Sequence, residues 1–350
     1  MSSDPTNSRL MRNLETSAES HDFQSEAIAV LNGQSLIRNA GIPLDLNWVQ
    51  EVRVNTSAVE RRAQSQVARR TVKKEWQAAW LLRAITCMDL TTLSGDDTEE
   101  RVRRLCAKGR RPIQQELVER LGIQQLHIQV AAICVYHTFV ETAVQALEGT
   151  GIHVAAVSTG FPAGLSPLAE RVGEIRRSVE AGAHEIDVVI TRAHVFGARW
   201  QALYDEIAAF RQACGSAHMK VILGTGDLAT LRNVARASFI AMMAGADFIK
   251  TSTGKEAVNA TVPVSLVMVR AIREYAQRTG MAVGFKPAGG IRTAKQSLDW
   301  LAMMKEELGD SWLRAAMFRF GASGMLGDIE RQLEHCATGR YSAEYRHPIA

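Results

Sequence analysis

The sequence of 350 residues has few cysteines, and they are poorly placed for crosslinking or for holding a metal. Five is an odd number, and no two of them form a Cys-x-x-Cys pair. This pattern argues against a disulfide framework and against a zinc site, and it favours a reducing compartment. We therefore expect a cytoplasmic protein. The cysteines are Cys87, Cys106, Cys134, Cys214 and Cys336.

Long apolar runs and a strong charge of either sign are also missing. No stretch of 18 apolar residues occurs, so we expect no membrane-spanning helix and no membrane partner. The N-terminus lacks the apolar region of a secretory signal. A net charge of +4 is too small in a chain of this length to indicate nucleic-acid binding. The most basic stretch, residues 61–74, is better interpreted as the solvated side of a helix.

The sequence does contain an ordinary globular composition and a repeating pattern. Hydrophobic residues make up 46% and charged residues 22%, which allows a sizeable core. From about residue 80, short apolar runs rich in β-branched residues alternate with stretches of helical period, such as residues 200–215. The eight runs predicted as strands are Ala84–Leu90, Gln129–Tyr136, His153–Ser158, Glu185–Ile190, Met219–Leu223, Asp247–Thr251, Ala282–Lys286 and Ala316–Phe320.

Eight strand–helix units predict an α/β fold of the TIM (β/α)₈ barrel type. A doubly wound sheet also alternates strands and helices, but it usually opens with a Gly-rich dinucleotide-binding or phosphate-binding turn, which this chain lacks. We expect residues 81–337 to form the barrel and residues 46–80 to form a leading helical segment packed on it. Residues 1–45 are predicted to be a poorly ordered extension, and residues 338–350 a C-terminal tail.

Charged residues lie in strands that a barrel should fill with apolar side chains. Asp187 lies within the fourth expected strand, Lys250 is near the end of the sixth and Lys286 ends the seventh. An internal salt bridge would explain a single aspartate–lysine pair about as well as a functional role. Two lysines at the ends of neighbouring strands are harder to explain in that way, because like charges in one pocket repel each other.

The same repulsion would serve catalysis. A lysine attacks a carbonyl only as the neutral amine, whereas free lysine has a pKa near ~10.4. Partial burial and a neighbouring ammonium both lower that pKa. The two lysines therefore predict a Schiff-base nucleophile and its electrostatic activator. Asp187 supplies a carboxylate that could carry protons between the reacting groups.

Glycines after the last two strands suggest a site for an anionic group. Gly289 and Gly290 follow the seventh expected strand, and Gly321 and Ser323 follow the eighth. Phosphate-binding barrels expose backbone N–H groups and a helix N-terminus after these two strands. Each glycine is a weak signal alone, because glycine after a strand usually marks a turn. Cations that could add to such a site are Arg292 and Lys255.

Several segments, in the same order along the chain, resemble the deoxyribose-phosphate aldolase family in its animal-type branch. They are MDLTTLSGDDT, AAICVY, EIDVVI, DFIKTSTGKEAVNAT, GFKPAGGIRTA and FRFGAS, and the resemblance runs from roughly Leu44 to Tyr345. It implies a class I aldolase that interconverts 2-deoxy-D-ribose 5-phosphate with D-glyceraldehyde 3-phosphate and acetaldehyde. Such an enzyme would act in the breakdown of deoxynucleosides.

The resemblance also implies a role for each matching position. Lys250 would form the Schiff base, Lys286 would lower the pKa of Lys250, and Asp187 would relay protons. No metal and no organic cofactor would be needed, and the partners would be a phosphorylated sugar and acetaldehyde. Barrels of this type often pair, so a homo-oligomer is one expectation. The sugar would be lined by Asp89, Thr91 and Thr253, and the phosphate would be held by Gly289, Gly290, Gly321 and Ser323.

Some features leave alternatives open. Gly324 stands where relatives often have serine or threonine, which would remove one hydroxyl donor from the phosphate site. Tyr341 and Tyr345 are candidates for a C-terminal tyrosine that assists proton transfer in some relatives. The chain could also be another Schiff-base aldolase or a transaldolase, which a panel of donor substrates would distinguish. A barrel that binds without turnover is a third hypothesis, and a Lys250→Ala variant would test it.

Overall fold

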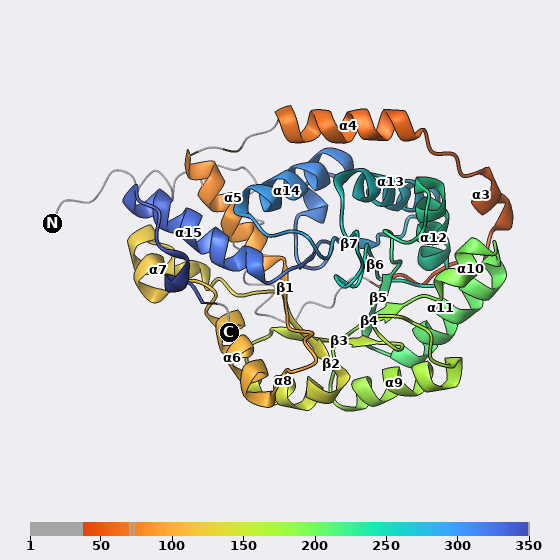
Figure 1. The fold of residues 1–350 in the computed structure, drawn as a ribbon, viewed down its shortest axis with the longest axis horizontal. Coiled ribbons are helices and arrows are strands. Elements are labelled where there is room, and N and C mark those ends of the chain that lie inside the picture. The colour runs from red at the N-terminus through yellow and green to blue at the C-terminus, as the bar shows by residue number, and fades with distance from the viewer. Residues whose placement is uncertain (1–37, 70–71, 73, 349–350) are drawn as a thin grey trace.

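The computed structural model describes residues 38–69, 72 and 74–348, and it contains one sheet of eight parallel strands. The hydrogen-bonded order is β7-β6-β5-β4-β3-β2-β1-β8. Isolated parallel bridges from Phe285 to Phe318 and from Ala288 to Gly321 join the two ends of this order, so the sheet closes (Figure 1). The strands are β1 Met88–Thr91, β2 Ala132–Tyr136, β3 His153–Ser158, β4 Glu185–Val189, β5 His218–Ile222, β6 Phe248–Lys250, β7 Gly284–Lys286 and β8 Phe320–Gly321.

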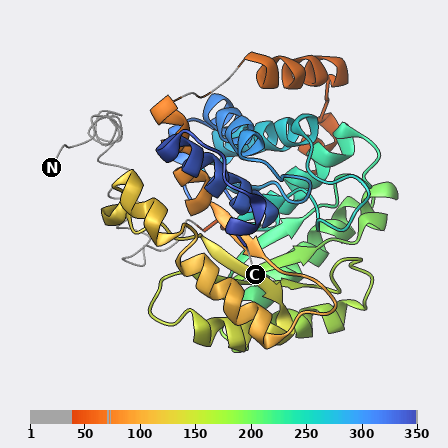
Figure 2. The same ribbon diagram turned by 60° about the vertical axis from the view of Figure 1, so that its left-hand side comes forward.

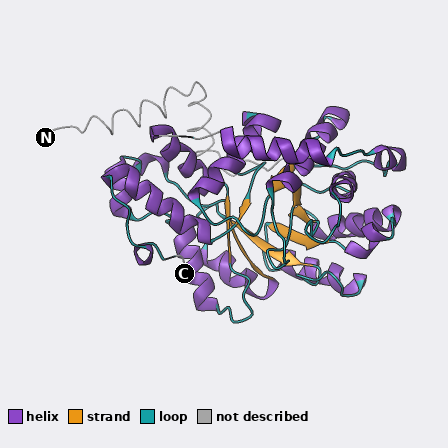
Figure 3. Cartoon of the chain, turned by 45° about the horizontal axis from the view of Figure 1, so that its top comes forward, coloured by secondary structure: helices purple, strands orange, loops and turns teal. Residues whose placement is uncertain are grey.

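Helices surround the strands on the outside, as Figures 2 and 3 show. The expected (β/α)₈ barrel with leading helices is therefore confirmed. The α-helices are α3 Leu46–Glu51, α4 Thr56–Arg69, α5 Lys74–Thr86, α6 Glu99–Arg110, α7 Gln115–Leu121, α8 Val140–Ala146, α9 Leu168–Glu180, α10 Arg192–Phe196, α11 Trp200–Cys214, α12 Leu231–Met243, α13 Val262–Thr279, α14 Ala294–Leu308 and α15 Gly324–Thr338. The 3₁₀ helices are η1 Gln124–Leu126, η2 His137–Phe139, η3 Asp310–Trp312 and η4 Glu344–Arg346. No helix within the described residues is both long enough and apolar enough to cross a membrane.

On β4, the strand alternation places apolar side chains outside the barrel and charged ones inside it. On β4, Ile186 and Val188 belong to the main hydrophobic core with the surrounding helices, while Glu185 and Asp187 point to the opposite face. Because successive side chains in a strand alternate between faces, one face of each strand can hold the helices while the other carries chemistry. The interior of this barrel therefore holds charged side chains beside a small apolar cluster, which contains Ala132, Cys134, Ala155 and Val157.

The first and the last expected strands are the least accurate, since the eighth shares only Phe320 with β8. Ala84–Leu90 was predicted to be a strand, but residues up to Thr86 form the last turns of α5, and β1 begins at Met88. Ala84 and Ile85 are fully buried, and α5 packs against α14 and α15. A short apolar run of a buried helix cannot be distinguished from a buried strand by periodicity alone. The other seven predicted strands overlap the observed ones, and β3 has the predicted bounds.

The predicted extension was also too long. Residues 1–37 lie outside the described residues, but Asn39–Asp45 pack on the barrel. The buried Asn39 side chain donates to the carbonyls of Met242 and Ala246 at 2.7 and 2.9 Å, and its backbone N–H donates to Asp247 at 3.0 Å. This segment leads into α3 and α4, and α4 packs on α13, as Figure 1 shows.

We predict that Asn39→Ala lowers the free energy of unfolding by about 1–3 kcal/mol, because it removes a buried amide that donates to the carbonyls of Met242 and Ala246 and accepts from Tyr275. Urea unfolding followed by circular dichroism measures this change. Glu51→Ala, at an exposed position in α3, is the control and should change stability by no more than about 0.5 kcal/mol. Equal, small effects of the two variants would mean that the segment before α3 does not contribute to the fold.

Candidate active site

Two lysines on neighbouring strands share one carboxylate. Lys250 and Lys286 are partners in the parallel register of β6 and β7. Their Nζ atoms lie 2.7 and 2.8 Å from Oδ2 of Asp187 on β4. All three side chains are buried. The structure thus brings together the three residues for which the sequence predicted Schiff-base chemistry.

Asp89 and Arg319 extend this cluster on the β1 and β8 side. Asp89 was predicted to line the sugar, yet it is fully buried and its Oδ2 accepts from Lys286 at 2.5 Å. The guanidinium of Arg319, just before β8, donates to the other oxygen of Asp89 at 2.6 Å. Arg319 was not among the predicted site residues.

Lys220 and Glu185 complete the cluster, and the sequence analysis missed them too. Lys220 of β5 donates to Oδ1 of Asp187 at 2.9 Å and forms an ion pair with Glu185 of β4. Glu185 also accepts from Arg319 at 2.7 Å. The signal was present, since Lys220, Glu185 and Arg319 are charged residues within the expected apolar strands, as Lys250 is.

The surroundings of the three acids in the cluster favour their ionised forms. Burial by itself would raise the pKa of Asp187, but Lys220, Lys250 and Lys286 hold it well below its usual range. The pKa of Glu185 is likewise well below normal, because Arg319 and Lys220 outweigh burial. The pKa of Asp89 is lowered as well, since its cationic neighbours outweigh the opposing effect of burial.

The cations divide into two kinds. Burial opposes the charge of Lys286, but Asp187 and Asp89 outweigh it and raise its pKa above the usual value. The same balance, set by Asp187 and Glu185, raises the pKa of Lys220. The pKa of Lys250 is instead lowered, because burial and Lys286 together outweigh the attraction of Asp187. Of the two predicted lysines, Lys250 is therefore the one suited to be a neutral nucleophile.

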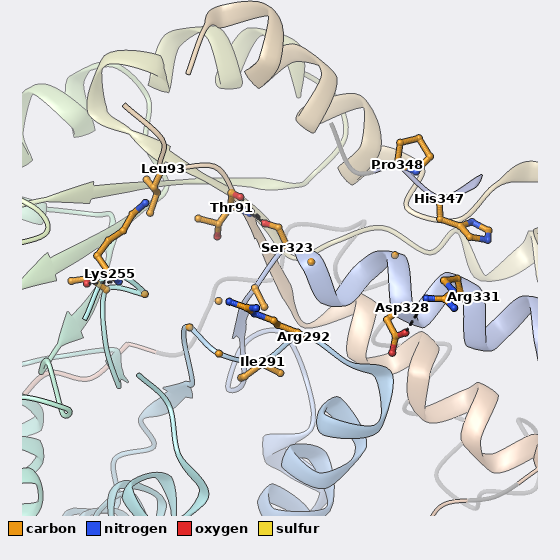
Figure 4. A pocket seen from close by; sticks show the side chains of 18 residues that line it. Thr91, Leu93, Lys255, Ile291, Arg292, Ser323, Asp328, Arg331, His347 and Pro348 are labelled. Atoms are coloured by element: carbon orange, nitrogen blue, oxygen red, sulfur yellow. Dashed lines mark hydrogen bonds and ion pairs between the residues drawn. The ribbon is translucent and has the colours of Figure 1, made fainter. Parts of the chain in front are cut away.

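A cavity of about 750 Å³ opens beside the cluster, at the carboxyl ends of the strands (Figure 4). Gly321 lies between the cavity and the charged interior. It lines the cavity, and a Cβ built on it would lie 3.2 Å from Cε of Lys286. Six of the predicted substrate residues line the cavity: Thr91, Thr253, Gly289, Gly290, Gly321 and Ser323.

Free backbone donors occur at only some of the predicted phosphate positions. The N–H of Gly289 donates to the carbonyl of Gly321 at 3.3 Å, and the N–H of Gly321 donates to that of Pro287 at 2.9 Å. The N–H groups of Gly290 and of Ser323 and Gly324, at the start of α15, have no acceptor among the described residues. Helix N-termini favour anions, so these three groups are suited to a phosphate.

Hydroxyl groups at the cavity hold the loops in place. Oγ of Ser323 donates to the carbonyl of Thr91 at 2.6 Å and accepts from its N–H at 2.8 Å, which ties the loop after β8 to the end of β1. Oγ1 of Thr253 donates to Glu256 at 2.7 Å and accepts from the N–H of Lys255. Both hydroxyls are therefore already engaged within the protein.

Cations and the C-terminal tail line the outer part of the cavity. Lys255, Arg292 and Arg331 follow one another across it, from one side of Figure 4 to the other. Tyr341 and Tyr345, the candidate tail tyrosines, are 63% and 84% exposed and are not among the lining residues. The tail reaches the cavity instead through His347 and Pro348, which the sequence analysis did not single out. His347 is held by Glu334 and Ser342, at 2.9 and 2.8 Å.

No group of three or more histidine, cysteine, aspartate or glutamate side chains is arranged to hold a metal ion in the described part of the chain. The five cysteines, all described, are free thiols. Cys134 faces the cluster from β2, and burial raises the pKa of its thiol.

Residues 83–326 match the family described as DeoC/LacD family aldolase. The chain is 58% identical over 314 residues to the deoxyribose-phosphate aldolase of Homo sapiens, covering 89% of this chain and 99% of that protein. It is 59% identical to the one of Mus musculus over 312 residues, covering 89% and 98%. Among solved structures, a putative deoxyribose-phosphate aldolase from Toxoplasma gondii is similar in fold, with a TM-score of 0.63, 22% identity and coverage of 75% of this chain and 96% of that chain.

Gly321→Ala should lower kcat/KM on the order of 10- to 100-fold. The new methyl group would lie 2.7 Å from Cβ of Ala288 and 3.2 Å from Lys286, so it displaces either the cavity floor or the lysine. Steady-state kinetics with 2-deoxy-D-ribose 5-phosphate measures this. Gly95→Ala, where the methyl group meets nothing within 4 Å, serves as the matched control. Full activity of Gly321→Ala would mean that the cavity floor is not where substrate meets Lys286.

Proposed function

The chain belongs to the DeoC/LacD family of aldolases, and we propose that it is a deoxyribose-phosphate aldolase that works through a Schiff base on Lys250. The substrate would be 2-deoxy-D-ribose 5-phosphate, and the products D-glyceraldehyde 3-phosphate and acetaldehyde. Relatives with this name share 58–59% identity with it over nearly their whole length. The observation that carries the chemistry is the buried pair of lysines on one oxygen of Asp187.

The first step needs a neutral amine and an exchangeable proton in the same place. The lowered pKa of Lys250 favours the neutral amine, which adds to the aldehyde carbon of the open-chain sugar to form a carbinolamine. Loss of water from the carbinolamine needs a proton on the leaving oxygen. Lys286 and Asp187, which touch at 2.8 Å, are the groups placed to supply it and to be reprotonated.

The second step breaks the bond between C2 and C3 of the sugar. A base removes the proton of the C3 hydroxyl, the electrons of the C2–C3 bond move into the iminium, and glyceraldehyde 3-phosphate leaves. The enamine that remains takes a proton at its terminal carbon, and water then releases acetaldehyde and the free amine. Asp187 is the carboxylate nearest the reacting nitrogen, at 2.7 Å, and we assign it the proton relay.

The phosphate would lie in the outer part of the cavity. The free N–H groups there are those of Gly290, in the loop after β7, and of Ser323 and Gly324, at the start of α15. Lys255 and Arg292 line the same part of the cavity. We propose that Gly289 and Gly321, which have no side chains, contribute mainly by leaving space in the cavity for the substrate. The free cysteines support a reducing compartment, and we propose the cytoplasm.

Reduction with borohydride in the presence of acetaldehyde or the sugar phosphate should add mass at Lys250, because borohydride traps the iminium as a stable amine. Peptide mapping by mass spectrometry locates the adduct. Lys255, an exposed lysine at the same cavity, provides an internal control and should stay unmodified. Active wild-type protein with an unmodified Lys250 would rule out the Schiff base at this residue.

Lys286→Leu should lower kcat by about 100-fold or more and move the acid limb of the pH profile to higher pH. The sign follows from the neighbouring charge: Lys286 lowers the pKa of Lys250, so its removal raises that pKa. The neutral amine then forms only at higher pH. The pH dependence of kcat/KM in the release of glyceraldehyde 3-phosphate measures both effects. An acid limb that stays in place would mean that Lys286 does not tune the amine.

A further inference from the structure

We propose that Arg319 and Glu185, which do not touch Lys250, are positioning residues that set its protonation through the charge balance of the barrel interior. The inference rests on the proposed function, since it concerns the amine that forms the Schiff base. It goes beyond the effect of Lys286, because it assigns the same control to residues deeper in the barrel.

The two residues lie below the reacting groups. Glu185 precedes Asp187 by two positions on β4, so it points to the same inner face at a deeper level. Arg319 reaches this level from the residue before β8, with its guanidinium over the Phe248 ring, 5.7 Å from the centroid. Both side chains are almost completely buried. Neither has solvent to compensate its charge, so each depends on the other members of the cluster.

The four cations of the cluster differ in how many carboxylates they contact. Asp89 divides its oxygens between Arg319 and Lys286. Both oxygens of Glu185 accept from Arg319, at 2.7 and 3.1 Å, and Oε2 also forms an ion pair with Lys220. Asp187 gives Oδ1 to Lys220, and its Oδ2 contacts both catalytic lysines. Within the described residues, Lys250 contacts one carboxylate, Asp187, whereas each of the other three cations contacts at least two. Lys250 is therefore the cation whose protonated form the carboxylates stabilise least.

The balance of charge gives the reason. Three carboxylates face four basic side chains, which leaves one excess positive charge if all four are protonated. A buried excess charge is costly, and a titratable group relieves that cost by losing its proton. In this cluster, we infer that Lys250 is the group that loses its proton. If Arg319 were neutral, three carboxylates would face three lysines, and Lys250 would keep its proton.

Other groups also act on the reacting amine, and substitutions at Arg319 or Glu185 would leave these residues unchanged. Asp187 of β4, Lys286 of β7 and the Cys134 thiol of β2 act on Lys250 directly. Lys220 of β5 contacts Asp187, and Asp89 of β1 contacts Lys286. His153 of β3 lies 2.7 Å from Glu185. A change at Arg319 or Glu185 therefore reaches Lys250 through neighbours that all remain in place.

The test compares two single variants and their double variant, each of which changes the net charge of the cluster, by the pH dependence of borohydride trapping at Lys250. Arg319→Met removes a cation and should move the pH midpoint of borohydride trapping with acetaldehyde upward, by about one unit or more. Glu185→Gln removes a carboxylate and should move that midpoint downward. The double variant restores the excess of one positive charge, so its midpoint should return close to that of the wild type. Arg278→Met, at an exposed position in α13, is the control for an arginine-to-methionine change.

The signs decide the outcome. Shifts in the same direction for the two single variants, or a double variant that does not return, would overturn the inference, because a merely structural defect predicts no such reversal. If Arg319→Met does not fold, Lys220→Met removes a cation from the same interior, and its midpoint should also rise. Absence of an adduct at Lys250 in the wild type would contradict the proposed function instead, before any variant is compared.

Discussion

The active centre depends on one oxygen atom that must satisfy two ammonium groups. Oδ2 of Asp187 lies within 2.8 Å of Nζ in both Lys250 and Lys286. Lys286 has a second carboxylate, Asp89, and Lys250 does not. This asymmetry separates two chemically identical side chains into a permanent cation and an amine whose pKa is lowered. Without it, proximity alone would not decide which lysine attacks the carbonyl.

Such a centre needs a fold that tolerates charge in its interior. In this barrel the apolar layer lies outside the strands, where residues such as Ile186, Val221 and Phe285 pack with the helices. The inner face is then free to hold charged groups, provided that each carboxylate meets a cation at short range. Closure of the sheet by the Phe285–Phe318 bridge keeps these side chains at fixed separations. The stability of the outer layer offsets the cost of the charged interior.

The sequence predicted the barrel and its three central residues because each is a charged residue in a recognisable apolar strand, and the two lysines also lie at or near the carboxyl ends of theirs. It missed Lys220, Glu185 and Arg319, although they too are charged residues in expected strands, because the local pattern does not show which of these side chains meet across the barrel. The α5–β1 boundary was wrong for a related reason, since Ala84 and Ile85 are buried whichever structure they adopt. Gly289 and Gly321 were predicted to offer N–H groups to a phosphate, but bridges near the β7–β8 closure use those groups, and only tertiary structure shows this.

The barrel also separates two electrostatic requirements that conflict. A phosphate needs nearby cations, whereas its own negative charge, placed close to Lys250, would stabilise the ammonium and suppress the nucleophile. The cations at the cavity, Lys255 and Arg292, are on loops beyond the strand ends and are exposed to water, so they need no buried carboxylate to stay charged. Water screens the phosphate where it would be held, while burial preserves strong interactions around the amine. A phosphorylated sugar therefore fits this arrangement, because its phosphate and its aldehyde are at opposite ends of the molecule. The phosphate can lie in the region that water screens while the aldehyde reaches the neutral amine of Lys250.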